Sequence, residues 1–207
     1  MILTTTITLH HGDIPKDLSF GSAVAVDTET LGLVPARDRL CLVQLSAGDG
    51  SAHLVQFNQG SYNAPNLKRL LSDDTVEKIF HFARFDLAIL KTYLGVECSP
   101  IFCTKIASKL CRTYTDRHGL KDICRELIEI SLSKEQQSSD WGTRELTAAQ
   151  KTYAASDVIY LHELREKLEL MLIREKRLGL AQACFQFLPH RVNLDLFGWP
   201  NTDIFEH

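Results

Sequence analysis

The sequence predicts an α/β domain in which a mixed sheet is flanked by helices. Three short apolar runs, bounded by Gly, Pro, Asp or Ser, lie within the first 60 residues and are typical of strands. Strand and helix patterns follow from Asn66, and helical periodicity dominates after Thr147. Because the strands come first and strand and helix units follow, the order favours a mixed sheet over a doubly wound one.

The elements of the first half follow from these patterns. Strands are expected near 24–27 (VAVD), 40–46 (LCLVQLS) and 52–57 (AHLVQF). The next elements are a short helix at LKRLL, a strand at 76–82 and a helix at 85–95. Gly95 is the expected C-cap of that helix, because glycine readily adopts the left-handed conformation found there.

The second half is predicted to be mainly helical. A short strand at 100–102 precedes two helical patterns, IASKLCRTY and LKDICRELIEI. Thr147 and Gln150 have the spacing of a capping box, so a long helix is predicted from there to Lys176. A further helix, LAQACFQFL, leads to Pro189 and an irregular tail.

Neither an internal repeat nor a linker divides the chain, so residues 1–207 are expected to form one domain. Residues 180–207 supply its C-terminal helix and tail. The apolar residues of this tail are expected either to pack back on the core or to form a contact between subunits.

Composition limits the class of protein. With 44% hydrophobic and 24% charged residues, the chain can bury one sizeable core. It has no run of about 18 apolar residues, and its start, MILTTTITLHHGD, lacks the features of a secretory signal, so a soluble, cytoplasmic protein is expected. The net charge of −3 argues against coating of long nucleic acid, but it does not exclude a small site for a short one.

The cysteines form no CxxC pair, and four of the six lie inside apolar patterns. We therefore favour buried, reduced thiols over zinc ligands or disulfides. The six are Cys41, Cys98, Cys103, Cys111, Cys124 and Cys184.

Two acidic residues end the first predicted strand. Asp27 and Glu29 are two residues apart, so their carboxylates project from the same face of the strand. Two neighbouring negative charges at the rim of a buried strand are costly unless a cation neutralises them. The alternative is that Asp27 only forms a turn at the strand end.

Further acids stand on predicted helices. Asp86 opens a helix, where the helix dipole alone would favour an acid. Tyr153 and Asp157 are four residues apart on a helix and therefore share one face. Taken singly, Tyr153 also fits a half-buried aromatic residue, and Asp157 also fits a solvated acid.

The order of these three acidic motifs along the chain points to a known family. DTET on a strand, HFARFD at a helix start and YAASD on a late helix resemble the exonuclease motifs of the DEDD superfamily. Its histidine branch has His five residues before the last Asp, and Thr152 occupies that position here, so the sequence resembles the tyrosine (DEDDy) branch. This resemblance implies the ribonuclease H-like (DnaQ-like) exonuclease fold.

The likeness continues outside the acids. HGLKDICRELI and SKEQQSSDWGTRELTAAQKTYAASDVIYL resemble the ribonuclease D group across most of residues 20–170. About 35 residues follow Ile173, fewer than the helical accessory domains of ribonuclease D need, so the chain is more similar to short, single-domain nanoRNases of the NrnC type. The resemblance implies 3′–5′ hydrolysis of very short RNA, including dinucleotides, to nucleoside 5′-monophosphates, by a homo-oligomer.

The resemblance also implies a division of labour among the acids. Asp27, Glu29 and Asp157 would hold one cation, Asp27 would bridge to a second, and Asp86 would support the second through water. Carboxylates suit Mg²⁺ or Mn²⁺ rather than zinc. Tyr153 would orient the attacking water, since a phenol is largely protonated at neutral pH.

Residues outside the acids are candidates for substrate contacts. Leu31, Gly32 and Leu33 follow the first motif, where the family places apolar and backbone contacts, and Leu31 either wedges between two bases or is a plain core leucine. The candidate contacts are Thr28, Leu31, Gly32, Gln44, His81, Arg84, Arg112, Arg117 and His118. His118 could equally begin a helix without binding a ligand.

Basic residues concentrate in one segment. Residues 105–125 contain six basic and two acidic residues, a local balance of +4. Solvated helix faces and a phosphate-binding patch at the substrate 5′ end explain this segment equally well.

Two other functions remain open from the sequence. One is a general ribonuclease D-like exonuclease that trims the 3′ ends of longer RNA or DNA. The other is a nucleic-acid-binding module that has lost catalysis, which the intact motif acids argue against.

Overall fold

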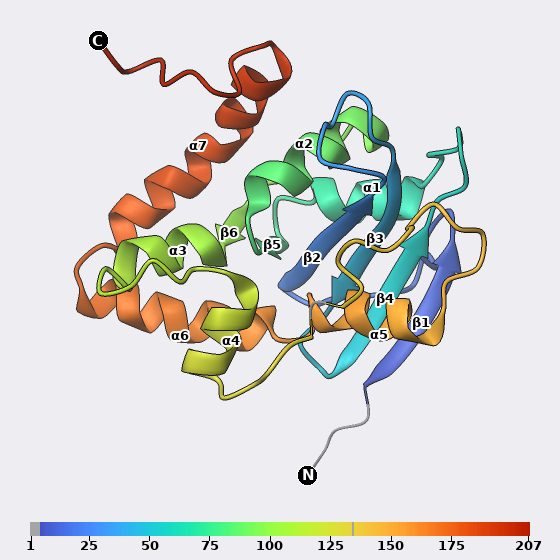
Figure 1. Cartoon of the computed structure of the whole chain (residues 1–207), viewed down its shortest axis with the longest axis horizontal. Coiled ribbons are helices and arrows are strands. Elements are labelled where there is room, and N and C mark those ends of the chain that lie inside the picture. Colours follow the sequence, from blue (N-terminus) through green and yellow to red (C-terminus); the bar gives the residue numbers. More distant parts are fainter. Residues whose placement is uncertain (1–4, 134) are drawn as a thin grey trace.

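The computed structural model describes residues 5–133 and 135–207. Within these ranges the chain forms a mixed sheet with helices packed against it, as the sequence predicts (Figure 1). The strands are β1 (Thr6–His11), β2 (Ala23–Thr30), β3 (Leu40–Ser46), β4 (Ser51–Gln56), β5 (Glu77–Phe80) and β6 (Ile101–Cys103). The helices are α1 (Pro65–Ser72), α2 (Ala83–Leu94), α3 (Thr104–Cys111), α4 (Leu120–Leu127), α5 (Ala148–Ser156), α6 (Leu161–Arg174) and α7 (Leu178–Leu196).

Strand β2 lies in the middle of the sheet. The strand order is β1-β4-β3-β2-β5-β6, in which β2 pairs antiparallel with β3 and parallel with β5. Val24, Ala25 and Val26 of β2 are fully buried. The strand therefore has a fixed position, and its last residues emerge from the sheet at a defined point.

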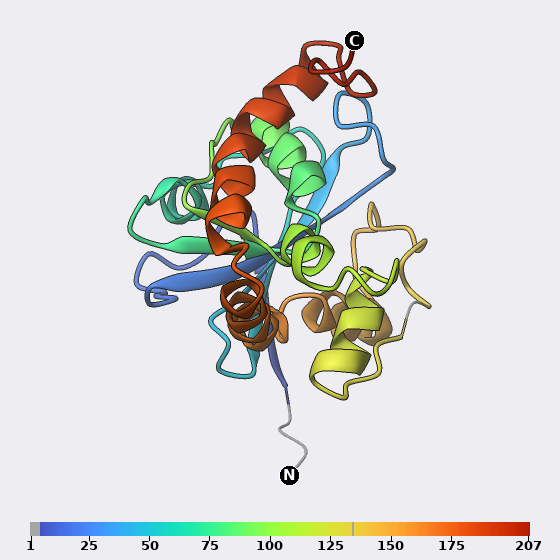
Figure 2. The same ribbon diagram turned by 90° about the vertical axis from the view of Figure 1, so that its left-hand side faces the viewer.

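Helices hold both sides of this strand. Helix α2 contacts β2, β3 and β5, whereas α5 contacts β1, β3 and β4. Figure 2 shows α7 running beside α2 towards the C-terminus. The main core joins the sheet to α2, α6 and α7, and a second, smaller cluster around Trp141 and Ala154 lies between α5 and the sheet.

Strand β1 was not predicted from the sequence. It pairs in parallel with β4 at the edge of the sheet. Its residues, TITLHH, are partly or fully exposed and include two threonines and two histidines. Ile7 and Leu9 do alternate with threonines, but two apolar positions at the edge of a sheet give a signal too short to mark a strand.

The predicted long helix from Thr147 to Lys176 is wrong in one respect. The chain leaves the helix after Ser156, turns through residues 157–160 and resumes as α6 at Leu161. The turn is made by backbone bonds from Val158 to Ala155 and from Leu161 to Val158. Such bonds span three residues and leave no mark in the hydrophobic pattern.

The predicted end of the last helix at Pro189 is also wrong. Helix α7 continues through Pro189 to Leu196. Leu188 and Val192 on either side of the proline are buried, and Asp195 near the helix end is bound to both Arg84 and Arg191. These tertiary contacts outweigh the backbone hydrogen bond that a proline removes.

The helix caps and the buried cysteines predicted from the sequence are confirmed. Gly95 is the C-cap of α2 with a φ of 69°, and Thr147 and Gln150 form the capping box of α5. Five of the six free cysteines are buried, and Cys184 is partly buried. Among the described residues no helix is both long and apolar enough to cross a membrane.

We predict opposite effects for alanine at two helix-terminal glycines. Gly95→Ala should lower the free energy of unfolding by about 1–2 kcal/mol, because an L-residue is strained at this positive φ. Gly179→Ala, inside α7 where an added Cβ meets nothing within 4 Å, should raise it by about 0.5–1 kcal/mol. Urea denaturation of the two variants measures both changes, and equal effects would contradict the C-cap assignment.

Candidate active site

The end of β2 brings two acids to one face of the sheet. Asp27 and Glu29 lie in register with Gln44 and Leu42 of β3. The side-chain amide of Gln44 donates to Asp27 Oδ2 over 3.4 Å. A shift in register between Glu29 and Thr30 then ends the regular pairing, and the chain turns along the rim of a cleft.

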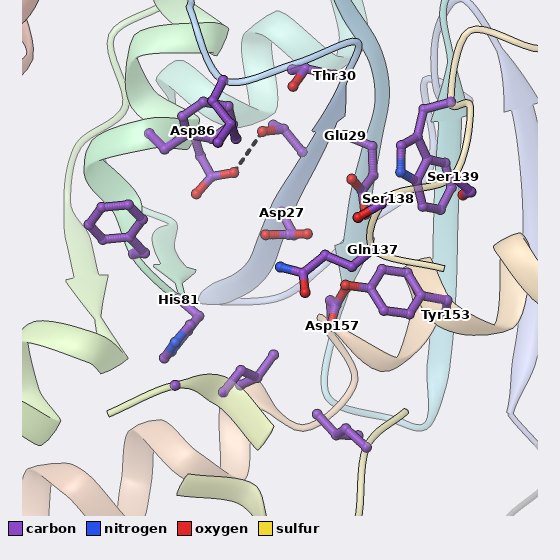
Figure 3. Close-up of a pocket in the computed structure, with 18 of the residues that line it drawn as sticks. Asp27, Glu29, Thr30, His81, Asp86, Gln137, Ser138, Ser139, Tyr153 and Asp157 are labelled. Atoms are coloured by element: carbon purple, nitrogen blue, oxygen red, sulfur yellow. Dashed lines mark hydrogen bonds between the residues drawn. The ribbon is translucent and has the colours of Figure 1, made fainter. Parts of the chain in front are cut away.

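Asp86 comes from the first turn of α2, which follows β5. Its side chain is 3% exposed, and Oδ1 accepts a 2.7 Å hydrogen bond from the Thr28 hydroxyl. Thr28 stands between the two acids of β2, so this bond ties α2 to the strand. Figure 3 shows the bond on the side of Asp27 away from Tyr153.

Asp157 arrives from the turn that interrupts the predicted long helix. It is the C-cap of α5, one turn after Tyr153. Asp27, Glu29 and Asp157 each offer an oxygen that lies within 4.8 Å of the others. In Figure 3 the Tyr153 hydroxyl lies beside Asp157, and Asp27 lies between Asp157 and Asp86.

Burial raises the pKa of all four carboxyl groups. Loss of hydration, followed by the charges of Asp86, Asp157 and Glu29, holds the pKa of Asp27 well above its ordinary value. Loss of hydration is also the main cause that raises the pKa of Glu29 to about 9 and those of Asp86 and Asp157 to about 7. The Thr28 hydroxyl opposes this rise at Asp86, and Tyr153 opposes it at Asp157.

This donor set fits divalent cations. Hard cations such as Mg²⁺ and Mn²⁺ take carboxylate oxygen, and their positive charge would favour the ionised carboxylates that burial disfavours. The cluster contains no thiolate or imidazole ligand that would favour zinc.

The acids line a cleft of about 600 Å³. Leu31, Gly32 and Leu33 form part of its rim. Leu33 is 82% exposed and Leu31 51%, so Leu33 projects farther than the leucine singled out from the sequence. Gly32 is required here, because a Cβ would lie 2.3 Å from a carboxylate oxygen of Asp38.

Basic and aromatic residues that were not selected from the sequence also line the cleft. Lys105 and Lys121 belong to the +4 segment, and the Lys105 ammonium lies 4.0 Å from the centre of the Phe82 ring. Phe82 is 45% exposed and has a φ of 70°. A left-handed conformation is strained for a bulky residue, and such strain concentrates at functional sites.

His81 lines the cleft as a neutral ring. The Thr104 hydroxyl donates to the Phe80 carbonyl, so it accepts from His81 Nδ1 over 2.9 Å. Burial and then the charge of Lys105 lower the pKa of His81 to about 3. The remaining nitrogen, Nε2, is therefore a hydrogen-bond acceptor.

Five predicted substrate contacts lie inside the fold or outside the lining of the cleft. Gln44 is fully buried beneath Asp27, and Arg84 is paired with Asp195 of α7. Arg112 is fully buried and bound to Glu126, Ser108 and the Arg117 carbonyl. Neither Arg117 nor His118, whose Nδ1 bonds the Ser108 hydroxyl, is among the residues lining the cleft.

These placements could not be read from charge spacing in the sequence. Charge spacing along a helix identifies which residues share a face, but it does not show whether that face meets solvent, a substrate or an internal partner. Lys105 and Lys121 lay in the same charged segment, and only the packing of α3 and α4 separates them from Arg112.

Comparison with known proteins identifies the family. Residues 10–173 match a family model described as 3′–5′ exonuclease. The chain belongs to this 3′–5′ exonuclease family. The exonuclease is 35% identical to ribonuclease D of Jannaschia sp. over 157 residues, which cover 74% of this chain and 40% of that relative. It therefore spans less than half the length of the curated ribonuclease D relatives it matches.

Solved structures extend the likeness to nearly the whole exonuclease. NrnC of Brucella melitensis bound to pGG is 56% identical, with a TM-score of 0.95 and coverage of 99% of this chain and 100% of that one. The same protein has been solved with bound Mg²⁺, at a TM-score of 0.94. Escherichia coli RNase D is 26% identical, with a TM-score of 0.73 and coverage of 83% of this chain and 45% of that one.

We predict that the metal-free exonuclease loses stability between pH 7 and pH 9. A carboxyl group whose pKa is raised by folding stabilises the fold fully below its unfolded value, about 4. This contribution falls as the pH rises above that value, and the loss is complete near pH 7 for Asp86 and Asp157 and near pH 9 for Glu29, so Glu29 carries the loss between pH 7 and pH 9. Added Mg²⁺ should raise the melting temperature more at pH 9 than at pH 7. Thermal melts with EDTA or with Mg²⁺ measure this.

Two variants serve as controls for the melts. Glu29→Gln should flatten the pH dependence, whereas Asp17→Asn, at an exposed acid, should leave it unchanged. A Mg²⁺ effect that is equal at both pH values in all proteins would contradict the electrostatic account.

We also predict that Arg112 supports the fold rather than the substrate. Arg112→Met should lower the free energy of unfolding by about 2–3 kcal/mol, because Ser108 and the Arg117 carbonyl lose a charged partner. Arg117→Met, at an exposed neighbour, should change it by less than about 0.5 kcal/mol. A rise in KM at unchanged stability of Arg112→Met would instead return this residue to the substrate site.

Proposed function

We propose that the exonuclease degrades very short RNA, including dinucleotides, to nucleoside 5′-monophosphates by a two-metal mechanism. The observation that carries the proposal is the near-complete likeness to a NrnC structure that holds pGG. Ribonuclease D, in contrast, resembles the chain over less than half its own length. A cleft of about 600 Å³ is also of the size of a site for a small ligand.

The four acids would hold the cations. We assign Asp27, Glu29 and Asp157 to one cation, Asp27 also to the second, and Asp86 to the second through water. The proximity of the first three acids and the separate position of Asp86 support this division. When bound, two cations would activate the attacking water and stabilise the leaving 3′ oxygen.

Tyr153 would orient the attacking water. Burial, followed by the charges of Asp157, Glu29 and Asp27, raises the pKa of this phenol further above its ordinary value. It therefore stays protonated and cannot act as a base at neutral pH. Its proton is directed to Asp157, which leaves the phenol oxygen to accept a hydrogen bond from water.

Residues at the rim would select a short substrate. Lys105 and Lys121 would meet the phosphate at the 5′ end, in place of the arginines predicted from the sequence.

Other residues of the cleft would contact the rest of the substrate. Leu33, with Leu31 beside it, would contact the bases whatever the base sequence, and the acceptor nitrogen of His81 would face a ribose hydroxyl. Thr28 would act indirectly, through its bond to Asp86.

A homo-oligomer stays a prediction. Phe197, Trp199, Ile204 and Phe205 at the C-terminal end are exposed, which is unusual for large apolar side chains and suits a contact between subunits.

Substrate length tests the proposal. The purified exonuclease is incubated with 5′-labelled RNAs of two and of about 20 nucleotides, in Mg²⁺ or Mn²⁺. The dinucleotide should be cleaved much faster, and EDTA or Asp27→Ala should reduce cleavage to background. Tyr153→Phe should lower kcat about 100-fold with little change in metal binding, because only the orientation of water is lost.

Asp17→Ala, at an exposed acid outside the cleft, is the matched control and should remain fully active. Stepwise shortening of the longer RNA with the dinucleotide left over would show a general ribonuclease D-like exonuclease. Absence of cleavage of both RNAs would leave a binding module. A DNA dinucleotide in parallel measures the dependence on the 2′-hydroxyl.

A further inference from the structure

A loop forms the wall of the cleft on the side of Tyr153. Gln137, Ser138 and Ser139 of this loop line the cleft. In Figure 3 the Gln137 side chain extends from the loop towards the space between Asp27 and Asp157. Gln137 is exposed, so its amide is open to a molecule that occupies the cleft.

The loop is held in place by Gln150. The Gln150 amide nitrogen donates to the Asp140 carbonyl over 3.0 Å and to the Ser139 hydroxyl over 3.3 Å. Ser139 in turn bonds the Gln136 carbonyl through both its hydroxyl and its backbone N–H, which closes a turn around Gln137. Gln150 is only 4% exposed, so these bonds are shielded from water.

The other end of the same amide caps α5. Gln150 Oε1 accepts from the Thr147 backbone N–H over 3.0 Å and from the Thr147 hydroxyl over 3.1 Å. Helix α5 carries Tyr153 and ends at Asp157. One side chain therefore joins the wall of the cleft to the helix that supplies two of its proposed functional groups.

We propose that Gln150 is a positioning residue that holds Gln137 over the carboxylates, where the Gln137 amide contacts the substrate. A neutral amide can donate to a phosphate oxygen without adding a charge to a site that already holds four acids. The bond pattern separates this role from helix capping, because the nitrogen of Gln150 serves the loop and its oxygen serves α5. The proposal needs only the exonuclease activity and not a preference for dinucleotides.

Two nearly isosteric variants separate the two roles. Gln150→Glu keeps both acceptor contacts with Thr147, but it replaces the donor to Asp140 and Ser139 by an oxygen. Thr147→Val removes the side-chain cap and leaves the donor to the loop intact. Gln150→Glu should raise KM about tenfold with kcat within about twofold, whereas Thr147→Val should lower the melting temperature and leave KM unchanged.

A double-mutant cycle tests whether Gln150 acts through Gln137. Gln137→Ala alone should raise KM about tenfold, and the double variant should be no worse than either single one, since both remove the same contact. Independent effects would multiply to about 100-fold and would overturn the proposal. So would a Gln150→Glu enzyme whose KM equals that of the wild type.

Further measurements cover the case in which a buried carboxylate at position 150 destabilises the protein. Amide hydrogen exchange of residues 139–142 should be faster in Gln150→Glu than in Thr147→Val, and equal rates would contradict the loop contact. If Gln150→Glu melts below the assay temperature, Ser139→Ala removes one acceptor on the loop side and should raise KM about threefold. An unchanged KM would then overturn the proposal.

Each variant is assayed on an RNA that the wild-type enzyme cleaves. The test therefore still holds if the enzyme turns out not to prefer dinucleotides.

Discussion

The crowding of four poorly hydrated carboxyl groups in one cleft is the constraint on which the site depends. Asp27, Glu29, Asp86 and Asp157 are held close together in an environment that raises the pKa of each. A flexible chain would avoid this cost by moving the acids apart into water. The fold prevents this because the acids are attached to a strand whose residues Val24 to Val26 are fully buried and to two helices that pack on the same sheet.

Holding these carboxyl groups together lowers the stability of the fold, and apolar burial elsewhere offsets this loss. Val24, Ala25 and Val26 of β2 and Ile89 and Leu90 of α2 are buried in one continuous apolar core. Their burial fixes the relative position of Asp27 and Asp86, and the Thr28 hydroxyl adds a direct bond between the two elements. An acidic floor, a cationic rim at Lys105 and Lys121, and a neutral amide wall at Gln137 then divide the cleft by charge. Under the proposed function, the phosphates of a short RNA would meet this acidic floor only when cations are bound to it, which would link substrate binding to the chemistry.

Local relations were well predicted from the sequence, and the gathering of the four acids was expected from the family resemblance, but other contacts between distant segments were not. The shared face of Asp27 and Glu29, the capping box at Thr147 and Gln150, and the four-residue spacing of Tyr153 and Asp157 are local, and each appears as expected. Arg84 and Arg112 form ion pairs with Asp195 and Glu126, respectively. No local sequence pattern identifies these partners. The same holds for Leu33, which sequence alone does not distinguish from Leu31. The contact of Gln150 with the loop could not be predicted either. Its position in the capping box already explains a glutamine there, so nothing in the sequence points to a second contact.

The turn at residues 157–160 has a mechanical consequence. Helix α5 rests on the β1, β3 and β4 side of the sheet, and α6 rests on β2 and β5. A continuous helix would act as a stiff rod, and any tilt of α6 would swing Asp157 relative to Asp27. The turn separates the two helices, so a tilt of α6 need not move Asp157. Substitutions in α6 or in its contacts with α7 can therefore leave the distances between the acids unchanged.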